Sequence, residues 1–196
     1  MDCKYETAPR AFETGRLILR SLRPVDAGLV LDYYLRNSAF LEEWEPVRSA
    51  DFYTPAYHAA QLAADCGQML EGHMLRLWIF KKGDGERTIG TICFSNIVRG
   101  AFLSCFLGYK LDGGEINRGY MTEALEKGIE IMFGEYGLHR IEANILPRNA
   151  RSLRVVEKLG FRDEGVGRKY LRINGAWEDH IHMVLLNEAW VPGTGA

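Results

Sequence analysis

The sequence predicts one α/β (α+β) domain. Its 196 residues suit a single domain of ordinary size, and a hydrophobic content of 47% is enough for a sizeable core. Helix-like and strand-like segments succeed one another, with three consecutive β-type runs in the middle of the chain. No repeat, low-complexity tract or linker interrupts them. We therefore expect residues 1–196 to form one domain, with tails at 1–12 and 191–196.

The first part of the chain predicts a strand, two helices and an antiparallel meander. Residues 16–20 alternate like a strand, and Pro24 then opens a helical stretch at the first turn, where proline is tolerated. Thr54 and Pro55 repeat this start signal before a second helix that reaches residue 72. The three β-type runs follow, and a glycine-containing turn separates the first two, so we expect a meander of 74–81, 87–95 and 101–111.

The second half predicts the order β-α-β-α-β-β, counted from the strand at 101–111. Apolar residues recur at helical spacing from residue 121 to 136, so one face of that helix is expected to be buried. Asn174-Gly175 is a strong hairpin signal between the last two strands. The remaining predicted elements are a strand at 139–146, a helix at 149–160 and strands around 168–173 and 179–186.

Composition argues against several classes of protein. The N-terminus lacks the apolar run of a secretory signal, and no apolar stretch approaches the roughly 18 residues of a membrane span. We expect a cytoplasmic protein with no membrane partner. A net charge of -2 gives no global attraction to nucleic acid. The four cysteines show no C-x-x-C spacing and are expected to be reduced. No metal is predicted, because the histidines show no convincing ligand set: 58, 73, 139, 180 and 182.

The segment EINRGYMTEALEKG, residues 115–128, places a glycine and an arginine directly before a helix. The first backbone N–H groups of a helix have no internal partner and carry the positive end of its dipole, so such a start favours a phosphate or pyrophosphate. Gly119 permits close approach and Arg118 adds a charge. An ordinary turn before a helix would show the same pattern, so the pattern alone leaves both interpretations open.

The helix at 149–160 carries a second basic feature. Asn149 suits its N-cap and Gly160 its C-terminal end. Arg151, Arg154 and Lys158 share one face, which is either a solvated surface or part of an anion site. Two basic helix starts beside neighbouring strand ends favour a single ligand with several phosphates.

Three motifs together resemble the GNAT superfamily of acyl-CoA-dependent N-acetyltransferases. They are N-R-G-Y-M-T-E-A, then H-R-I-E-A-N-I-L-P-R-N-A-R-S-L-R-V-V-E-K-L-G-F, then Y-L-x-I-N-G-x-W-x-D-H. The segments at 40–48 and 94–102 resemble the RimJ/RimL-type group, which acetylates protein N-termini, typically of a ribosomal protein. The resemblance spans Arg16 to Trp190. It implies a mixed, mostly antiparallel twisted sheet flanked by helices, with acetyl-CoA as cosubstrate.

The resemblance also implies a set of cofactor-binding residues. The loop that would hold the pyrophosphate of acetyl-CoA falls on Ile116, Asn117, Arg118, Gly119, Tyr120 and Met121. Ile116 replaces the usual Gln or Arg and Met121 replaces Gly or Ala, which would weaken the affinity rather than change the ligand. Asn149 would help to fix the cofactor. Backbone N–H groups of the strand at 107–110, with Leu107 and Tyr109, would supply the oxyanion donor.

The catalytic candidates are Ser152, Glu142 and Asn144. Ser152 matches the family's leaving-group acid, although a first-turn serine that satisfies the helix backbone would look the same. Glu142 and Asn144 alternate with Arg140 onto one face of their strand. Glu142 would orient a water or act as the base, or else be a solvated partner of Arg140. An α-amino group needs only a modest base, because about a tenth of it is neutral at pH 7.

Substrate recognition and function remain open to alternatives. Trp44 and Glu45 belong to an acidic aromatic cluster that suits a cationic amine, and Trp177 heads a similar one, although such clusters at a helix end are more often ordinary surface. The leading hypothesis is acetyl transfer to a protein N-terminus, by a monomer or homodimer. The alternatives are acetylation of a small amine, such as a polyamine, amino acid or antibiotic, and a non-catalytic acyl-CoA-binding module.

Overall fold

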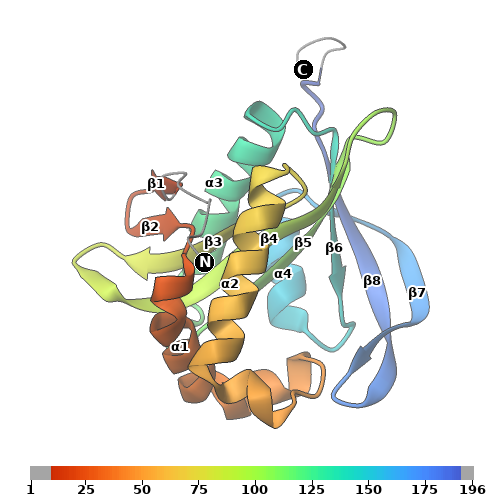
Figure 1. Ribbon diagram of the computed structural model, residues 1–196. Helices are drawn as coiled ribbons and strands as arrows, with labels where there is room; N and C mark the ends of the chain where they lie inside the picture. Colours follow the sequence, from red (N-terminus) through yellow and green to blue (C-terminus); the bar gives the residue numbers. More distant parts are fainter. Residues whose placement is uncertain (1–9, 191–196) are drawn as a thin grey trace.

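A mixed eight-stranded sheet forms the centre of the molecule (Figure 1), in a computed structural model that describes residues 10–190. Its strand order is β1-β2-β3-β4-β5-β6-β8-β7. Among the strands of this described range, only β5 and β6 are parallel, which confirms the mostly antiparallel sheet that the family resemblance implied. The strands are β1 (Ala11–Glu13), β2 (Leu17–Arg20), β3 (Leu75–Lys81), β4 (Asp84–Val98), β5 (Ser104–Leu111), β6 (Arg140–Ile145), β7 (Arg162–Ile173) and β8 (Ala176–Leu186).

Four α-helices cover the two faces of the sheet. The pair α1 (Ala27–Leu41) and α2 (Pro55–Leu70) packs on Trp78 and Phe80, while α3 (Tyr120–Gly134) and α4 (Ala150–Lys158) pack on the larger apolar cluster of the other face. Figure 1 shows α1 and α2 in front of the sheet and α3 and α4 behind it. Short 3-10 turns complete the order: η1 (Pro24–Asp26), η2 (Glu42–Trp44), η3 (Ala50–Tyr53) and η4 (Gly113–Glu115).

The start and turn signals of the sequence act as expected. The Thr54 hydroxyl accepts a hydrogen bond from the Tyr57 N–H group at 3.2 Å, and Pro55 opens α2. Asn149 caps α4 by accepting from the Ser152 N–H group at 3.1 Å. Asn174 and Gly175 both have positive φ, at 42° and 83°, as a two-residue hairpin turn of type I′ requires.

The structure differs from the sequence prediction mainly at element ends. Residues 11 and 12, assigned to the N-terminal tail, pair with β2 in the three-residue strand β1, which is too short to show a period. The helix predicted from Pro24 begins as a 3-10 turn and continues to Leu41. Residues 101–103 precede β5 instead of forming its start. The predicted tail at 191–196, like residues 1–9, lies outside the described residues.

Strands β5 and β6 pair at one end only. Their register runs from Ser104 opposite Arg140 to Phe106 opposite Glu142, after which β5 continues to Leu111 and β6 to Ile145 without pairing with each other. Figure 1 shows the two strands diverging beyond this point. On this edge, the backbone N–H and C=O groups of β5 beyond Phe106 have no neighbouring strand to bond. The sheet is therefore open in its middle, beside the start of α4.

Asp112 links α1 to the turn after β5 through hydrogen bonds. Its carboxylate accepts hydrogen bonds from the Arg36 guanidinium, from Arg87 Nη2 at 2.8 Å and from the Gly114 N–H group at 2.9 Å. Burial alone would raise the pKa of Asp112, but these donors outweigh it and lower the pKa to about 2. The turn that leads to the glycine loop is thereby held in place.

Asp112→Asn is expected to lower the free energy of unfolding at neutral pH. A depressed folded-state pKa means that the carboxylate stabilises the fold above its unfolded-state pKa of about 4, and that this stabilisation is lost as the pH falls through the folded-state pKa. Urea unfolding of wild type and variant, from neutral pH down toward pH about 2, should show their difference shrink. A difference that stays constant with pH would contradict this role.

Candidate active site

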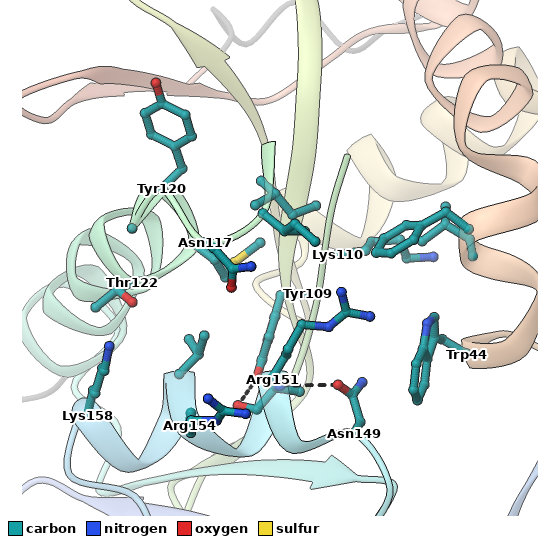
Figure 2. Close-up of a pocket in the computed structure, with 18 residues that line it drawn as sticks. Trp44, Tyr109, Lys110, Asn117, Tyr120, Thr122, Asn149, Arg151, Arg154 and Lys158 are labelled. Carbon is teal, nitrogen blue, oxygen red and sulfur yellow. Dashed lines mark hydrogen bonds between the residues drawn. The ribbon is translucent and has the colours of Figure 1, made fainter. Parts of the chain in front are cut away.

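A pocket of about 330 Å³ lies between the start of α3, the length of α4, the end of β5 and the α1–η2 junction (Figure 2). Its basic lining side chains are Lys110, Arg151, Arg154 and Lys158. No acidic side chain lines it within the described part of the chain. The pocket therefore suits an anionic ligand.

The start of α3 turns free N–H groups toward this pocket. Gly119 is the N-cap residue and has a φ of 79°, which favours glycine. The first helical hydrogen bond runs from the Glu123 N–H group to the Gly119 carbonyl at 3.1 Å. The N–H groups of Tyr120, Met121 and Thr122 thus have no acceptor within the helix, and all three residues line the pocket. This is the geometry of a phosphate site.

Glu123, the acidic residue in the first turn of α3, has its negative charge balanced by residues outside the helix. The Glu123 carboxylate accepts from the Thr14 hydroxyl at 2.6 Å and from the Arg16 N–H and Nε groups, each at 2.7 Å. Burial raises the pKa of Glu123, but these bonds outweigh burial and lower the pKa. Arg16 Nη1 also donates to the Arg118 carbonyl at 2.9 Å. The turn between β1 and β2 therefore holds the loop without placing a negative charge in the pocket.

Five of the six predicted loop residues line the pocket, and one does not. Arg118 lies outside its lining and pairs with Glu115 at 3.2 Å, so its charge is not directed at the site as the sequence suggested. Met121 is 6% exposed and packs its side chain into the core, so its bulk does not fill the loop. The other four that line the pocket are Ile116, Asn117, Gly119 and Tyr120.

The basic face of α4 lies in the pocket. Figure 2 shows Arg151, Arg154 and Lys158 along one wall, with Lys158 beside Thr122 of α3 and Trp44 on the opposite side. The Arg151 guanidinium lies over the Phe40 ring of α1, 5.5 Å from its centroid. Of the two interpretations of this stripe, the structure favours the anion site.

Ser152 meets a tyrosine where the sheet opens. The hydroxyls of Ser152 and Tyr109 lie 2.5 Å apart, and the Tyr109 hydroxyl also donates to the Ser152 carbonyl at 3.1 Å. Burial raises the pKa of Tyr109 and the bond to Ser152 opposes it only in part, so the phenol stays protonated at neutral pH. The family resemblance implied only a backbone role for Leu107 and Tyr109. Their period-2 spacing places both side chains on the face of β5 toward α4, and this spacing is the sequence signal for the contact with Ser152.

Glu45 is engaged in ion pairs within the protein and is not available to bind a cationic amine. It pairs with the half-buried Lys110 ammonium and with Arg48 Nη2, the latter at 2.6 Å. Burial raises the pKa of Glu45, but Lys110 and Arg48 outweigh it and lower the pKa. Lys110 Nζ also reaches the Tyr34 hydroxyl at 3.1 Å, and the pKa of Lys110 is raised although burial opposes this. The expected role of Glu45 in holding a cationic amine is therefore corrected to an internal ion pair.

Trp44 and Trp177 have different surroundings. Trp44 lines the pocket, with the Arg148 guanidinium 5.0 Å from its ring centroid. Trp177 is 62% exposed on β8 and lines none of the cavities that we describe. Only Trp44 of the two is placed to contact a ligand.

Glu142 and Asn144 lie on the face of β6 turned away from α4, since Ile141, Ala143 and Ile145 pack into the cluster that contains α4. Glu142 is held by His182 Nδ1 at 2.9 Å and Arg140 Nη2 at 2.8 Å. Burial raises its pKa, but these partners lower it, which disfavours proton uptake near neutral pH. Asn144 donates weakly to the Tyr170 hydroxyl at 3.4 Å, and its Oδ1 atom has no described partner.

The family model described as acetyltransferase (GNAT) domain matches residues 16–162. The chain belongs to this family. The [ribosomal protein uS5]-alanine N-acetyltransferase of Escherichia coli K12 is 38% identical over 180 residues, which are 92% of each chain. The ribosomal-protein-S5-alanine acetyltransferase of Vibrio fischeri superposes with a TM-score of 0.88, at 37% identity, over 93% of this chain and all of its own. Mycobacterium smegmatis RimJ in complex with CoA-disulfide gives 0.83 at 30% identity, over 94% and 88%.

These likenesses confirm the resemblance inferred from the motifs. The protein is an acyltransferase, and within the GNAT family it is of the RimJ type. Two absences hold for residues 10–190, the part of the chain that the structure describes. No group of three or more His, Cys, Asp or Glu side chains is placed to hold a metal ion, and no helix is long and apolar enough to cross a membrane. Cys93 and Cys105 form no disulfide with another residue of that described range.

Proposed function

We propose that the protein transfers the acetyl group of acetyl-CoA to the α-amino group of a protein N-terminus. A ribosomal protein is the proposed acceptor, because the curated relative from Escherichia coli is named for the alanine of ribosomal protein uS5. The proposal rests on one observation, which is that three features of the molecule lie at the same pocket. The free helix start of α3, the basic face of α4 and the opening between β5 and β6 all meet at one pocket.

The residues present fit acetyl-CoA as cosubstrate. N–H groups at the start of α3 and the side chains of Arg154 and Lys158 suit its phosphates. The free edge of β5 beyond Phe106 offers backbone donors and acceptors for the extended arm and for the oxyanion. Ile116 contributes no polar group, so phosphate binding rests on the backbone and on α4. Acetyl-CoA supplies the activated acyl group, and the residues of the protein bind it, orient it and transfer protons.

Ser152 is the proposed acid for the departing thiolate. Its hydroxyl lies at the N-terminal turn of α4, beside the opening of the sheet, and Asn149 fixes its backbone N–H group. When Ser152 gives up its proton, the Tyr109 hydroxyl 2.5 Å away is the donor that replaces it. The raised pKa of Tyr109 keeps that proton available at neutral pH.

The proposed acceptor approaches from the opposite face of the opening. An α-amino group, with a reference pKa near 8, is about a tenth neutral at pH 7 and needs only a modest proton acceptor. Asn144 presents an oxygen with no hydrogen-bond partner in the described chain, which suits it to orient the amine. Glu142, whose two oxygens are already bonded, would position a water through His182 rather than take the proton itself.

The acceptor class is tested by acetyl-CoA consumption and mass-spectrometric mapping over a mixed panel. The panel holds short peptides with free N-terminal Ala, Ser or Thr, the same peptides blocked at the N-terminus and carrying an internal lysine, and polyamines. We expect acetylation at free N-termini only. Turnover of polyamines alone would assign the protein to small-molecule chemistry, and CoA binding without turnover would make it a binding module.

A further inference from the structure

A second cavity, of about 450 Å³, lies on the α1/α2 face of the sheet. Its walls come from α1, α2, β3, β4, β5 and the loop that follows η2. It shares Trp44, Tyr109 and Lys110 with the pocket that we assign to acetyl-CoA. The two cavities therefore meet at the end of β5, where the sheet is open.

Gly108 keeps the new cavity open at this junction. It lines the cavity, and a Cβ atom built on it would have no atom within 4 Å other than those of Gly108 itself and its two neighbours in the chain. It pairs with Cys93 on β4, but lies beyond the last residue of β5 that pairs with β6. A chain whose amine reaches the open edge of β5 from this face would thus extend into the cavity.

A polar cluster of Asp65, Arg76, His58 and Trp78 lines the cavity away from this junction. Asp65, His58 and Trp78 are each 2% exposed, and Arg76 is half-buried. Arg76 Nη1 lies 3.1 Å from Asp65 Oδ2, and Gln61 Nε2 donates to Asp65 Oδ1 at 3.0 Å. The cluster is thus built on one ion pair between a buried carboxylate and a half-buried guanidinium.

Hydrogen-bonding capacity in this cluster is left unused. Trp78 Nε1, Arg76 Nε and His58 Nε2 have no hydrogen-bond partner among residues 10–190. Asp65 Oδ2 takes part in the ion pair but accepts no well-aligned hydrogen bond. Buried groups of this kind are costly unless something in the cavity bonds them. The cavity therefore favours an occupant that brings both donors and acceptors.

The charges of the cluster balance. Asp65 and Arg76 cancel, and burial together with Arg48 lowers the pKa of His58, which keeps the imidazole neutral at neutral pH. A charged occupant would have no counter-charge left in the cluster, while an apolar one would displace water without replacing its hydrogen bonds. A neutral polar group avoids both costs.

We propose that this cluster is a specificity site that recognises a neutral, hydrogen-bonding side chain on one of the first two residues of the acceptor. The inference rests on the proposed function, since it needs an N-terminal peptide at the open edge of β5. It adds the chemical class of acceptor: carboxamide or hydroxyl side chains bind well, and their apolar or charged counterparts of similar shape bind poorly.

The test compares kcat/KM for peptides that differ at residue one or two by Asn, Leu, Asp or Lys, with Thr and Val as a second matched pair. For wild type we expect Asn to exceed Leu by about tenfold or more at one of the two positions, because the site's buried polar groups stay unpaired with Leu. Equal rates for Asn and Leu, and for Thr and Val, at both positions would overturn the inference.

Three variants separate recognition from mere structural support. Trp78→Phe removes one N–H donor and keeps the ring, so the preference for Asn over Leu should fall. Asp65→Asn leaves the Arg76 charge uncompensated, so the Asp peptide should gain relative to the Asn peptide. Arg76→Met leaves the Asp65 charge uncompensated, so kcat/KM for the Lys peptide should rise relative to the Asn peptide.

The controls are Trp190→Phe, which changes a tryptophan packed on His139, and Asp32→Asn, on the exposed side of α1.

A loss of fold lowers the rates for all peptides together, whereas a recognition site changes their ratios. Variants that slow every peptide equally, with no exchange of charge preference, would overturn the inference while leaving N-terminal acetylation intact. Failure of wild type to acetylate any free N-terminus would overturn both the inference and the proposed function.

Discussion

Ser152→Ala is expected to lower kcat by about a hundredfold or more, the usual contribution of a positioned general acid, with little change in the Kd for acetyl-CoA. The reason is geometric. The Ser152 hydroxyl contacts Tyr109 at the opening between β5 and β6, whereas the basic side chains that suit the phosphates lie further along α4. Steady-state kinetics with an N-terminal peptide, together with calorimetric titration of acetyl-CoA, would measure both quantities.

Tyr109→Phe serves as the matched variant for this prediction. It removes the hydroxyl that would return a proton to Ser152 but keeps the buried ring, so we expect a smaller loss in kcat than for Ser152→Ala. Equal losses in kcat and in acetyl-CoA affinity for Ser152→Ala would point to a structural cap instead of an acid. An unchanged kcat would remove Ser152 from the mechanism.

The double variant Arg154→Ala, Lys158→Ala is expected to weaken acetyl-CoA binding by about a hundredfold or more, since hydrogen bonds to charged groups each contribute roughly 1.5–3 kcal/mol and each 1.4 kcal/mol is tenfold in Kd. Both side chains line the pocket opposite the start of α3, with no acidic side chain among the residues that line it. The difference from wild type should shrink as salt is added, because screening weakens exposed charge pairs.

Lys127→Ala is the control for this pair. Lys127 lies on α3, bonds to Glu130 at 2.8 Å and does not line the pocket, so its removal should leave acetyl-CoA affinity unchanged. Calorimetric titrations at low and high salt would compare the three proteins. Equal Kd values for wild type and double variant would show that the basic face of α4 is a solvated surface.

Local signals in the sequence predicted much of the fold. Thr54, Asn149 and the Asn174-Gly175 turn act within a few residues of themselves, so their patterns are legible without tertiary structure. The start of α3 at Gly119 was predicted for the same reason. Strand β1 was not, because three residues give no period and its stability comes from pairing with β2.

The parts of the site that sequence did not predict are contacts between distant segments. Glu45 meets Lys110 across 65 positions, and Tyr109 meets Ser152 across 43. Arg118 was predicted to contact the ligand because it adjoins the glycine loop, but the structure pairs it with Glu115 and leaves it outside the pocket lining. The polar cluster around Asp65 had no local signal either, since its members come from α2 and β3.

The most direct test of the proposed function is acetyl transfer to an intact ribosomal protein. Recombinant uS5 with a free N-terminal alanine would be incubated with isotopically labelled acetyl-CoA and the protein, beside the same uS5 blocked at its N-terminus. Mass-spectrometric mapping should find the label on the α-amino group of the free protein, none on lysine side chains and none on the blocked protein. Label on lysines, or no label while polyamines are acetylated, would contradict the account.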